Sequence, residues 1–166
     1  MWPRVSGMAS GVVLREYREG DLEAICLLDE ACFAEAFRFD RASMRLFAER
    51  RRAISLVAEV EGGNEIAGFV IVHLEGNGAA LRGYVVTLDV AEEWRRRGVA
   101  EALMDEAEGR AKAAGAVVMD LHVYTGNQGA IRFYEGRGYV QTGVGKRFYG
   151  AAGLDAFMYR KVLEEK

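Results

Sequence analysis

The sequence predicts a single α/β (α+β) domain with a mixed, mostly antiparallel central sheet and helices on both faces. The length of 166 residues fits one domain. β-rich segments separated by short turns fill the middle of the chain, which is typical of an antiparallel meander. After residue 98 the apolar pattern takes a helical period, and a strand, a helix and two more strands follow it. The expected element order is β-α-α-β-β-β-α-β-α-β-β.

The first elements are a short strand and two capped helices. Val12–Arg15 is β-rich. Asp21 then precedes apolar residues at helical spacing, and Asp40 precedes a second amphipathic segment. Aspartate is a favoured N-cap because its carboxylate accepts hydrogen bonds from the free N–H groups of the first helical turn. We therefore expect a helix after each aspartate.

Three consecutive strands should form the meander. Ile54–Val60 and Glu65–Leu74 are joined by a glycine-containing turn, which favours a hairpin. A second turn rich in glycine and asparagine leads into Ala80–Val90. These three segments therefore predict the antiparallel part of the sheet.

The second half begins with a long helix that should end at Gly115. Its buried stripe falls four or three residues apart, which is the spacing of one helix face. The stripe consists of Val99, Leu103, Ala107, Ala111 and Ala114. The remaining predicted elements are a strand at Val117–Tyr124, a helix at Asn127–Arg137, and strands at Tyr139–Val144 and Ala156–Val162.

Composition gives no sign of a nucleic-acid or membrane partner. The formal net charge is −3, so any basic site must be local. No apolar run approaches the roughly 20 residues of a transmembrane helix. Cys26 and Cys32 point in different directions if both lie on one helix, so we expect two reduced thiols and a cytoplasmic location. Residues 1–10 read as a loose N-terminal extension, which leaves residues 11–166 as the single domain.

The segment between the third meander strand and the long helix predicts a phosphate site. Helix N-termini carry unpaired N–H groups and partial positive charge. Gly98 and Ala100 keep large side chains away from that backbone, and three preceding arginines add positive charge. The alternative is a solvated basic cluster beside an ordinary helix start.

Two motifs in order resemble the signatures of the GNAT superfamily of N-acetyltransferases. The first has the form Arg-x-x-Gly-x-Ala and the second the form Asn-x-x-Ala-x-x-x-Tyr, followed by Gly-Tyr. They lie on the elements where the superfamily carries them, and the predicted element order matches its fold along nearly the whole domain. The motif residues are Arg95, Gly98, Ala100, Asn127, Ala130, Tyr134, Gly138 and Tyr139.

The resemblance implies that the chain uses acetyl-CoA as co-substrate and needs no metal. The strand ending at Val90 would bind the pantetheine arm through the backbone, and the turn after it would bind the pyrophosphate. His73 and His122 are the only histidines, so nothing in the sequence suggests a metal cluster. The implied cofactor-binding residues are Leu88, Asp89, Val90, Arg95, Arg96, Arg97, Gly98, Val99, Ala100, Glu101 and Asn127.

Acetyl transfer to an amine needs a base and benefits from an acid at the leaving sulfur. Tyr134 matches the family tyrosine that acts as this acid; its alternative role is core packing. His122 is the candidate base, since imidazole titrates near neutrality. In the eukaryotic N-terminal acetyltransferases that this region resembles, a tyrosine at the position of Tyr84 partners the histidine through water. The bacterial ribosomal-protein alanine enzymes usually carry glutamate at the position of His122. If His122 is not the base, the alternatives are bulk water and Glu35.

The acceptor is expected to be the N-terminal α-amine of a protein or peptide. Phe148, Tyr149 and Phe33 resemble aromatic residues that hold the peptide in the protein N-terminal acetyltransferases; the alternative is a small apolar cluster. A lysine or small-molecule amine acetyltransferase on the same fold remains a second hypothesis. A CoA-binding sensor without activity is a third. The sequence predicts no oligomeric state.

Overall fold

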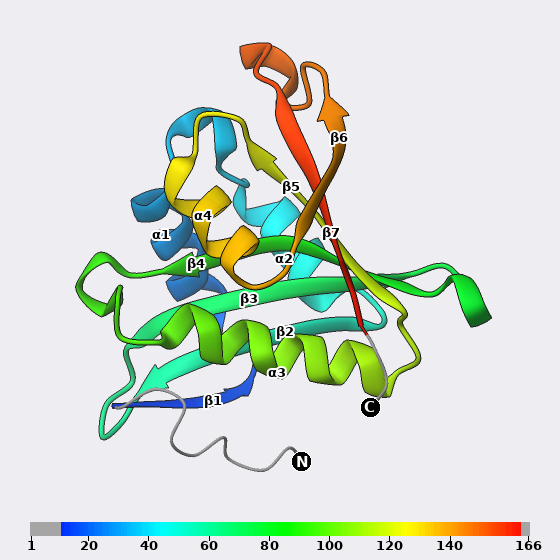
Figure 1. Ribbon diagram of the computed structural model, residues 1–166. Helices are drawn as coiled ribbons and strands as arrows, with labels where there is room; N and C mark the ends of the chain where they lie inside the picture. Colours follow the sequence, from blue (N-terminus) through cyan, green and yellow to red (C-terminus); the bar gives the residue numbers. More distant parts are fainter. Residues whose placement is uncertain (1–10, 164–166) are drawn as a thin grey trace.

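The structure is a computed structural model, and residues 11–163 of it are described (Figure 1). Seven strands form one sheet in the order β1-β2-β3-β4-β5-β7-β6. Every neighbouring pair is antiparallel except β4 and β5. The predicted class and element order are confirmed. The strands are β1 Val12–Glu16, β2 Ala53–Val60, β3 Ile66–Glu75, β4 Arg82–Val90, β5 Val118–Tyr124, β6 Val140–Gly145 and β7 Ala156–Val162. The α-helices of the described region are α1 Leu22–Cys32, α2 Arg41–Glu49, α3 Val99–Ala113 and α4 Gln128–Gly136.

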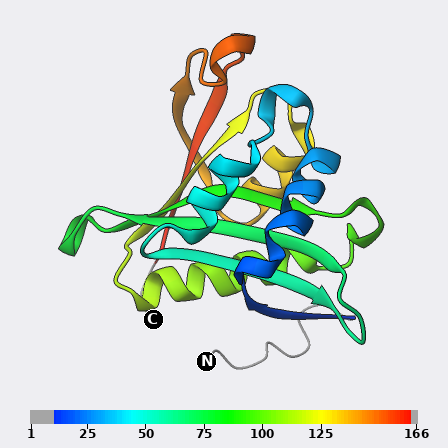
Figure 2. The same ribbon diagram turned by 180° about the vertical axis from the view of Figure 1, so that it is seen from behind.

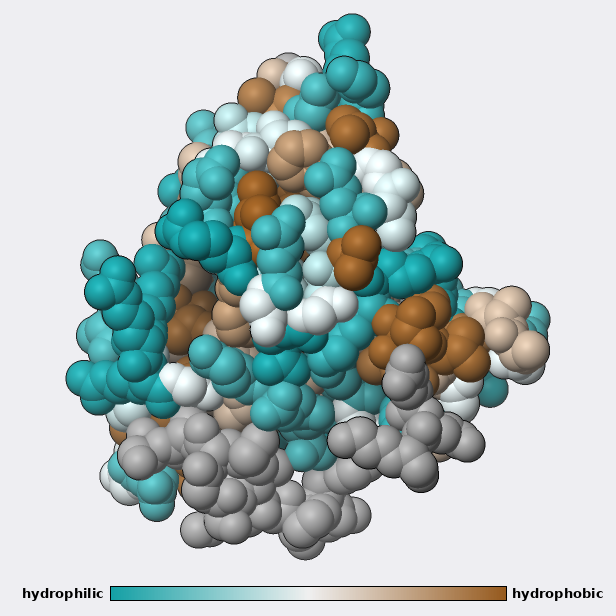
Figure 3. Space-filling model, viewed as in Figure 1, coloured by the Kyte–Doolittle hydropathy of each residue, from teal (hydrophilic) through white to brown (hydrophobic). Residues whose placement is uncertain are grey.

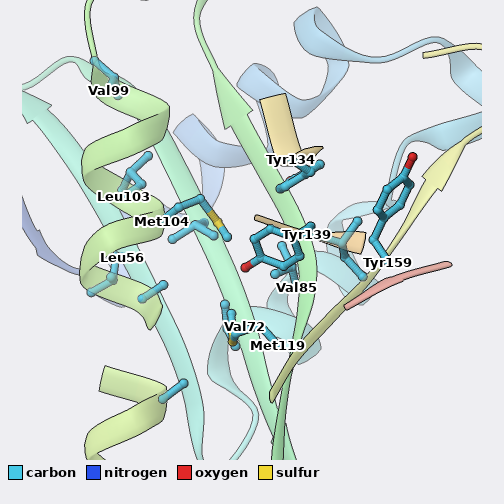
Figure 4. Close-up of a cluster of buried hydrophobic side chains, with 14 of the residues drawn as sticks. Leu56, Val72, Val85, Val99, Leu103, Met104, Met119, Tyr134, Tyr139 and Tyr159 are labelled. Atoms are coloured by element: carbon cyan, nitrogen blue, oxygen red, sulfur yellow. The ribbon is translucent and has the colours of Figure 1, made fainter. Parts of the chain in front are cut away.

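Helices cover both faces of the sheet. The view in Figure 1 has α3 in front, and the reverse view in Figure 2 has α1 in front with α2 beside it. The α1–α2 side buries one apolar cluster and the α3 side another. On α3 the predicted stripe is buried except for Ala114, which is exposed because it caps the helix just before Gly115. Figure 4 shows Leu103 and Met104 of α3 directed toward the sheet.

The two predicted aspartate caps behave differently. Asp40 accepts a hydrogen bond of 2.7 Å from the backbone N–H of Ser43 at the start of α2. Asp21 occupies the N-cap position of α1, but its carboxylate binds the Arg15 guanidinium at 2.8 and 2.9 Å instead. At Asp21, an ion pair with Arg15 of β1 therefore replaces the local capping hydrogen bond.

The sheet opens between β4 and β5. Their parallel pairing stops at Val85 and Leu121, and β5, β7 and β6 then diverge from the rest of the sheet (Figure 1). The register of β3 against β4 shifts at the same level, which leaves Val86 as an extra residue on β4. Such a bulge bends and twists its strand. Helix α4 lies in the opening between the diverging ends of β4 and β5 (Figure 1).

Outside the opening, the described surface is mainly hydrophilic on the α3 side, with separate hydrophobic patches (Figure 3). Cys26 and Cys32 are both free thiols, as expected. Among the helices of residues 11–163, none is long and apolar enough to cross a membrane. The predicted N-terminal extension, residues 1–10, lies outside the described residues.

Candidate active site

A cavity of about 510 Å³ occupies the opening between β4 and β5. Its walls come from the loop between α1 and α2, from β3, β4, β5 and α4, and from the loop between β6 and β7. Segments far apart in the sequence therefore meet here. Of the predicted site residues, Phe33, Tyr84, Leu88, His122, Asn127, Tyr134, Phe148 and Tyr149 line the cavity.

The edge of β4 that faces the cavity offers free peptide groups. The N–H of Ala91 donates to the carbonyl of Ala67 at 2.8 Å. Peptide groups alternate in direction along a strand, so those of Leu88 and Val90 point the other way, toward the opening. The Val90 carbonyl is already bound there, by Arg95 Nε at 3.0 Å and by Cys32 Sγ at 3.4 Å. The Val90 N–H and the Leu88 peptide groups remain as the hydrogen-bonding edge.

Asp89 lies between these two residues, but its side chain points away from the opening. It is 1% exposed and faces Asp29 of α1. The sequence-based prediction placed Asp89 with the cofactor-binding residues. In the structure its peptide groups point toward β3, opposite to those of Leu88 and Val90, and its carboxyl group belongs to the packing beneath α1.

The turn before α3 concentrates backbone N–H groups. Arg96 and Gly98 both have positive φ, 62° and 85°, and Gly98 is the N-cap of α3. Alternation of left-handed residues turns successive N–H groups toward one side, which makes an anion-binding concavity, and the N-terminal end of a fifteen-residue helix adds partial positive charge. This geometry suits a phosphate group.

The three arginines of this turn do not act alike. Arg95 turns back onto the Val90 carbonyl and Cys32. Arg97 lies over the Trp94 ring, with its guanidinium carbon 4.8 Å from the ring centroid. Arg96 is exposed, as is Glu101 in the first turn of α3, while Val99 is buried. The predicted phosphate site would therefore be built mostly from backbone, and less from the arginine side chains that indicated it in the sequence.

Helix α4 brings two predicted residues to the cavity. Asn127 is its N-cap, and Asn127 Oδ1 accepts a hydrogen bond of 3.1 Å from the N–H of Ala130, so only the amide N–H₂ is left for a ligand. Tyr134 follows two turns later and is 8% exposed. Burial raises the pKa of Tyr134 above its ordinary value, so its hydroxyl stays protonated near neutrality. Tyr134 is therefore in the right state to donate a proton.

His122 and Tyr84 are joined directly. The Tyr84 hydroxyl lies 2.8 Å from His122 Nδ1, whereas the resemblance implied an intervening water. Burial raises the pKa of Tyr84 to about 12, with smaller effects from the charges of Tyr149 and Glu75. Burial and then Arg82 lower the pKa of His122. At neutral pH the hydroxyl therefore donates to a neutral imidazole, and the ring proton resides on Nε2.

Aromatic rings wall the cavity around this pair. The Phe148 ring stacks on His122 with centroids 4.1 Å apart and planes 10° from parallel. Tyr149 meets the edge of Phe37 at 4.7 Å, and Phe37 also contacts Tyr124 at 5.0 Å. The sequence prediction chose Phe33 from the α1–α2 loop and missed Phe37. The only signal for Phe37 was a second aromatic in the same loop, four residues on.

The other candidates from the sequence have ordinary placements. Glu35, the second candidate base, is exposed and does not line the cavity. His73 lines it, but its Nε2 lies 2.9 Å from the Phe47 carbonyl and its Nδ1 lies 3.0 Å from Arg50. Burial lowers the pKa of His73. Within residues 11–163, no group of three or more His, Cys, Asp or Glu side chains is arranged to hold a metal ion.

Comparison with known sequences supplies the class. A profile described as "Acetyltransferase (GNAT) family" matches residues 7–139. The chain is 28% identical over 148 residues to N-alpha-acetyltransferase 30 of Schizosaccharomyces pombe, covering 89% of this chain and 96% of that protein. It is 35% identical over 79 residues to NAA20, the catalytic subunit of the Arabidopsis thaliana N-terminal acetyltransferase B complex. That match spans 47% of this chain and only 45% of the subunit.

Solved structures share the fold. Ard1 from Thermoplasma volcanium superposes with a TM-score of 0.81 at 24% identity, covering 93% of this chain and 99% of that one. Nourseothricin acetyltransferase superposes with a TM-score of 0.75 at 24% identity, covering 93% of this chain and 100% of that one. Arabidopsis thaliana NAA60, solved with acetyl-CoA, superposes with a TM-score of 0.79 at 21% identity, covering 91% of this chain and 98% of that one. At these identities the structures establish only the fold.

This chain belongs to the GNAT family of acetyltransferases. It is an acetyl-CoA-dependent N-acetyltransferase.

Proposed function

We propose that this protein transfers the acetyl group of acetyl-CoA to the N-terminal α-amine of a protein or peptide, by direct attack in a ternary complex. One observation carries the proposal. A hydrogen-bonded tyrosine and neutral histidine, Tyr84 and His122, face a cavity that the buried Tyr134 also lines. A proton acceptor and a proton donor therefore lie on two sides of one space.

Features of the strand and the following turn support acetyl-CoA as the co-substrate. The Val90 N–H and the Leu88 peptide groups suit the amides of a pantetheine arm, and the N–H groups around Gly98 suit its phosphates. Asn127 is left with its amide N–H₂ to donate further along. Acetyl-CoA supplies an acetyl group already activated as a thioester. The protein's own residues then need to orient an amine and move two protons.

Tyr84 and His122 act together as the base. The amine loses a proton to the Tyr84 oxygen while Tyr84 passes its own proton to His122 Nδ1, so the tyrosine is unchanged and the imidazole becomes charged. Tyr84 cannot be the base alone, because burial raises the pKa of its hydroxyl to about 12 and its phenolate is scarcely populated near neutrality. Neutral His122 provides the final acceptor near neutrality. On the opposite side, Tyr134 donates its hydroxyl proton to the leaving sulfur.

The acceptor class follows from proton affinity and from shape. An α-amine has a pKa of about 7.7–8.0, whereas lysine has about 10.4, so an imidazole base deprotonates the former far more readily. Phe37, Tyr149 and Phe148 line the acceptor side of the cavity. An extended chain terminus fits between such rings. The Tyr149 hydroxyl already interacts with the Tyr124 backbone, and its proton is left to donate to a peptide carbonyl. Both features favour a peptide N-terminus.

We also propose that the reaction takes place in the cytoplasm, without a nucleic-acid or membrane partner. Cys26 and Cys32 are unpaired thiols, which suits a reducing compartment. The net charge of −3 offers no general attraction to polyanions.

The test is a thiol-release assay on two forms of one short peptide that contains a single lysine. One form has a free N-terminus and the other is blocked there, and mass spectrometry locates the added acetyl group. We expect acetylation of the free form at its α-amine and little reaction with the blocked form. His122→Ala should strongly reduce turnover on the free peptide. Equal or faster acetylation of the blocked peptide would replace this proposal with the lysine or small-molecule amine alternative.

A further inference from the structure

Two buried carboxyl groups face each other between α1 and β4, outside the residues that line the cavity. Asp29 and Asp89 are each 1% exposed. Each has one oxygen that no group of the described protein satisfies, Asp29 Oδ1 and Asp89 Oδ2. The two carboxyl groups lie close enough to each other for a hydrogen bond if one of them carries a proton. Two carboxylates cannot hydrogen-bond, since an ionised carboxylate only accepts.

The remaining oxygen of each group is bound to a different part of the active site. Asp29 Oδ2 accepts a hydrogen bond of 3.0 Å from the backbone N–H of Phe39, at the end of the α1–α2 loop. Asp89 Oδ1 accepts one from the Thr87 hydroxyl on β4, and Thr87 lines the cavity. The pair therefore links the loop of the acceptor side to the strand of the cofactor side.

We propose that Asp29 and Asp89 are positioning residues for acetyl transfer that share one proton, carried on Asp89 Oδ2 and donated to Asp29 Oδ1. One proton satisfies both orphan oxygens and leaves the two outer oxygens free to accept from Phe39 and Thr87. The shared proton holds the loop that carries Phe33 and Phe37 against β4. The expected effect of this proton on catalysis rests on the function proposed above. The existence of the shared proton does not depend on that function.

The surroundings favour a protonated Asp89. Burial and the hydrogen bond and charge of Asp29 raise its pKa well above that of an ordinary carboxyl group, against opposing effects of Thr87 and Arg95. The titratable and charged groups around Asp89 are Asp29 and Cys32 from α1, Arg95 from the segment after β4, and Tyr134 from α4. Among them Arg95 is the only cation, and it also binds the Val90 carbonyl.

The position of the proton also matters for the proposed acid. After burial, an ionised Asp89 would be the strongest influence on Tyr134, and it would raise the pKa of that hydroxyl. A neutral Asp89 keeps negative charge away from the site where a thiolate leaves. The pair places its one negative charge on Asp29 instead, beneath the loop and bound to the Phe39 N–H.

Two isosteric variants separate the hydrogen bonds from the charge. Asp89→Asn donates to Asp29 through its amide and leaves the charge on residue 29. Asp29→Asn donates to Asp89 and accepts from Phe39, but it moves the charge to residue 89, beside Tyr134. Both retain the link between loop and strand. We expect Asp29→Asn to have a severalfold lower kcat than Asp89→Asn on the free-N-terminus peptide, with similar KM values for that peptide.

A measurement without substrates tests the proton directly. A carboxyl whose pKa is raised on folding contributes stability that is complete at low pH and is lost as pH rises toward the raised value. We therefore expect the folding equilibrium constant of the wild type, measured by denaturant unfolding, to fall as the pH rises above 5. Relative to Asp89→Asn, this fall should approach tenfold per pH unit. Infrared spectra at pH 7 should show a protonated carboxyl band that Asp89→Asn lacks.

The alternatives are distinguishable. Parallel stability profiles for the wild type and Asp89→Asn, or the absence of a protonated carboxyl band, would overturn the shared proton. Equal kcat values for the two asparagine variants would overturn the proposal that a proton on Asp89 keeps negative charge away from Tyr134. Should the wild type prove inactive toward amines, the proposed function fails, while the stability profiles and the infrared band still decide whether the proton is shared.

Discussion

The cofactor side and the acceptor side of the proposed site are built from different materials. On the cofactor side, the groups that suit a ligand are backbone N–H and C=O groups of β4 and of the turn at Gly98. On the acceptor side, they are the side chains of Tyr84, His122 and Tyr149, which come from β4, β5 and the loop between β6 and β7. A backbone site depends on the local path of the chain, whereas a side-chain site depends on tertiary packing. Substitutions that change the backbone should therefore impair cofactor binding, whereas replacement of single side chains should impair the acceptor side.

The largest effect should come from the backbone turn. Gly98→Glu forces a side chain into a position with φ of 85° and adds negative charge where phosphate would bind. We expect it to abolish the rise in melting temperature that saturating acetyl-CoA gives the wild type. Ligand at about 100 times its Kd stabilises a native protein by about 2.7 kcal/mol, which is readily seen in a thermal shift.

Gly109→Glu is the matched control for this change. Gly109 is exposed on the same helix and has open space around its Cα. It makes the same change in charge far from the turn, so its response to acetyl-CoA should equal that of the wild type. A normal thermal shift in Gly98→Glu would show that the phosphate site lies elsewhere.

The next effect concerns Tyr134, where the two sides meet. Tyr134→Phe removes the proton donor but keeps the ring, so acetyl-CoA binding should persist while kcat falls. Loss of a general acid typically costs about a hundred- to ten-thousand-fold. Tyr159→Phe is the control, since it removes a buried tyrosine's hydroxyl, bound to Glu135 at 2.8 Å, away from the cavity. An unchanged kcat in Tyr134→Phe would assign this tyrosine to packing.

This contrast explains what the sequence could predict. The element order, the turn at Gly98 and the residues of the second motif are local patterns, and the structure has them at or near the expected positions. The bulge at Val86 has no such pattern, because it arises from the register of two strands. The facing of Asp29 and Asp89 depends on how α1 lies over the sheet, sixty residues away in sequence. The sequence shows only two acids, each on its own apolar element.

The acceptor side should respond to the loss of a single ring. Tyr149→Ala removes the partner of Phe37, and we expect the KM for peptide to rise about tenfold, since tyrosines are enriched among the contact residues whose truncation costs more than about 1 kcal/mol. The KM for acetyl-CoA should change little. Tyr149→Phe separates the ring from the hydroxyl and should have a smaller effect. If both KM values rose together, Tyr149 would be part of the scaffold and not of the acceptor side.

The smallest effect is a shift in a pH profile, and it tests whether His122 is the final proton acceptor. Burial and then the Arg82 charge lower the pKa of His122, while Asp120 acts in the opposite direction. The plot of kcat/KM should therefore rise with pH through an inflection below the ordinary histidine value of about 6.5. Arg82→Gln removes the repelling cation, and Asp120 stays paired with Arg160 at 2.6 and 2.8 Å. The inflection should then move to higher pH.

The size of this shift should depend on salt, because the Arg82 side chain is 40% exposed and added ions screen its charge. Arg132→Gln provides the control, as it removes the same charge from an exposed position on α4 and should leave the inflection in place. His122→Ala should abolish the inflection altogether. An inflection that stays fixed in Arg82→Gln and survives in His122→Ala would mean that another group, or bulk water, takes the proton. The Tyr84–His122 hydrogen bond would then serve to shape the acceptor side, and the peptide N-terminus would have to be deprotonated before it binds.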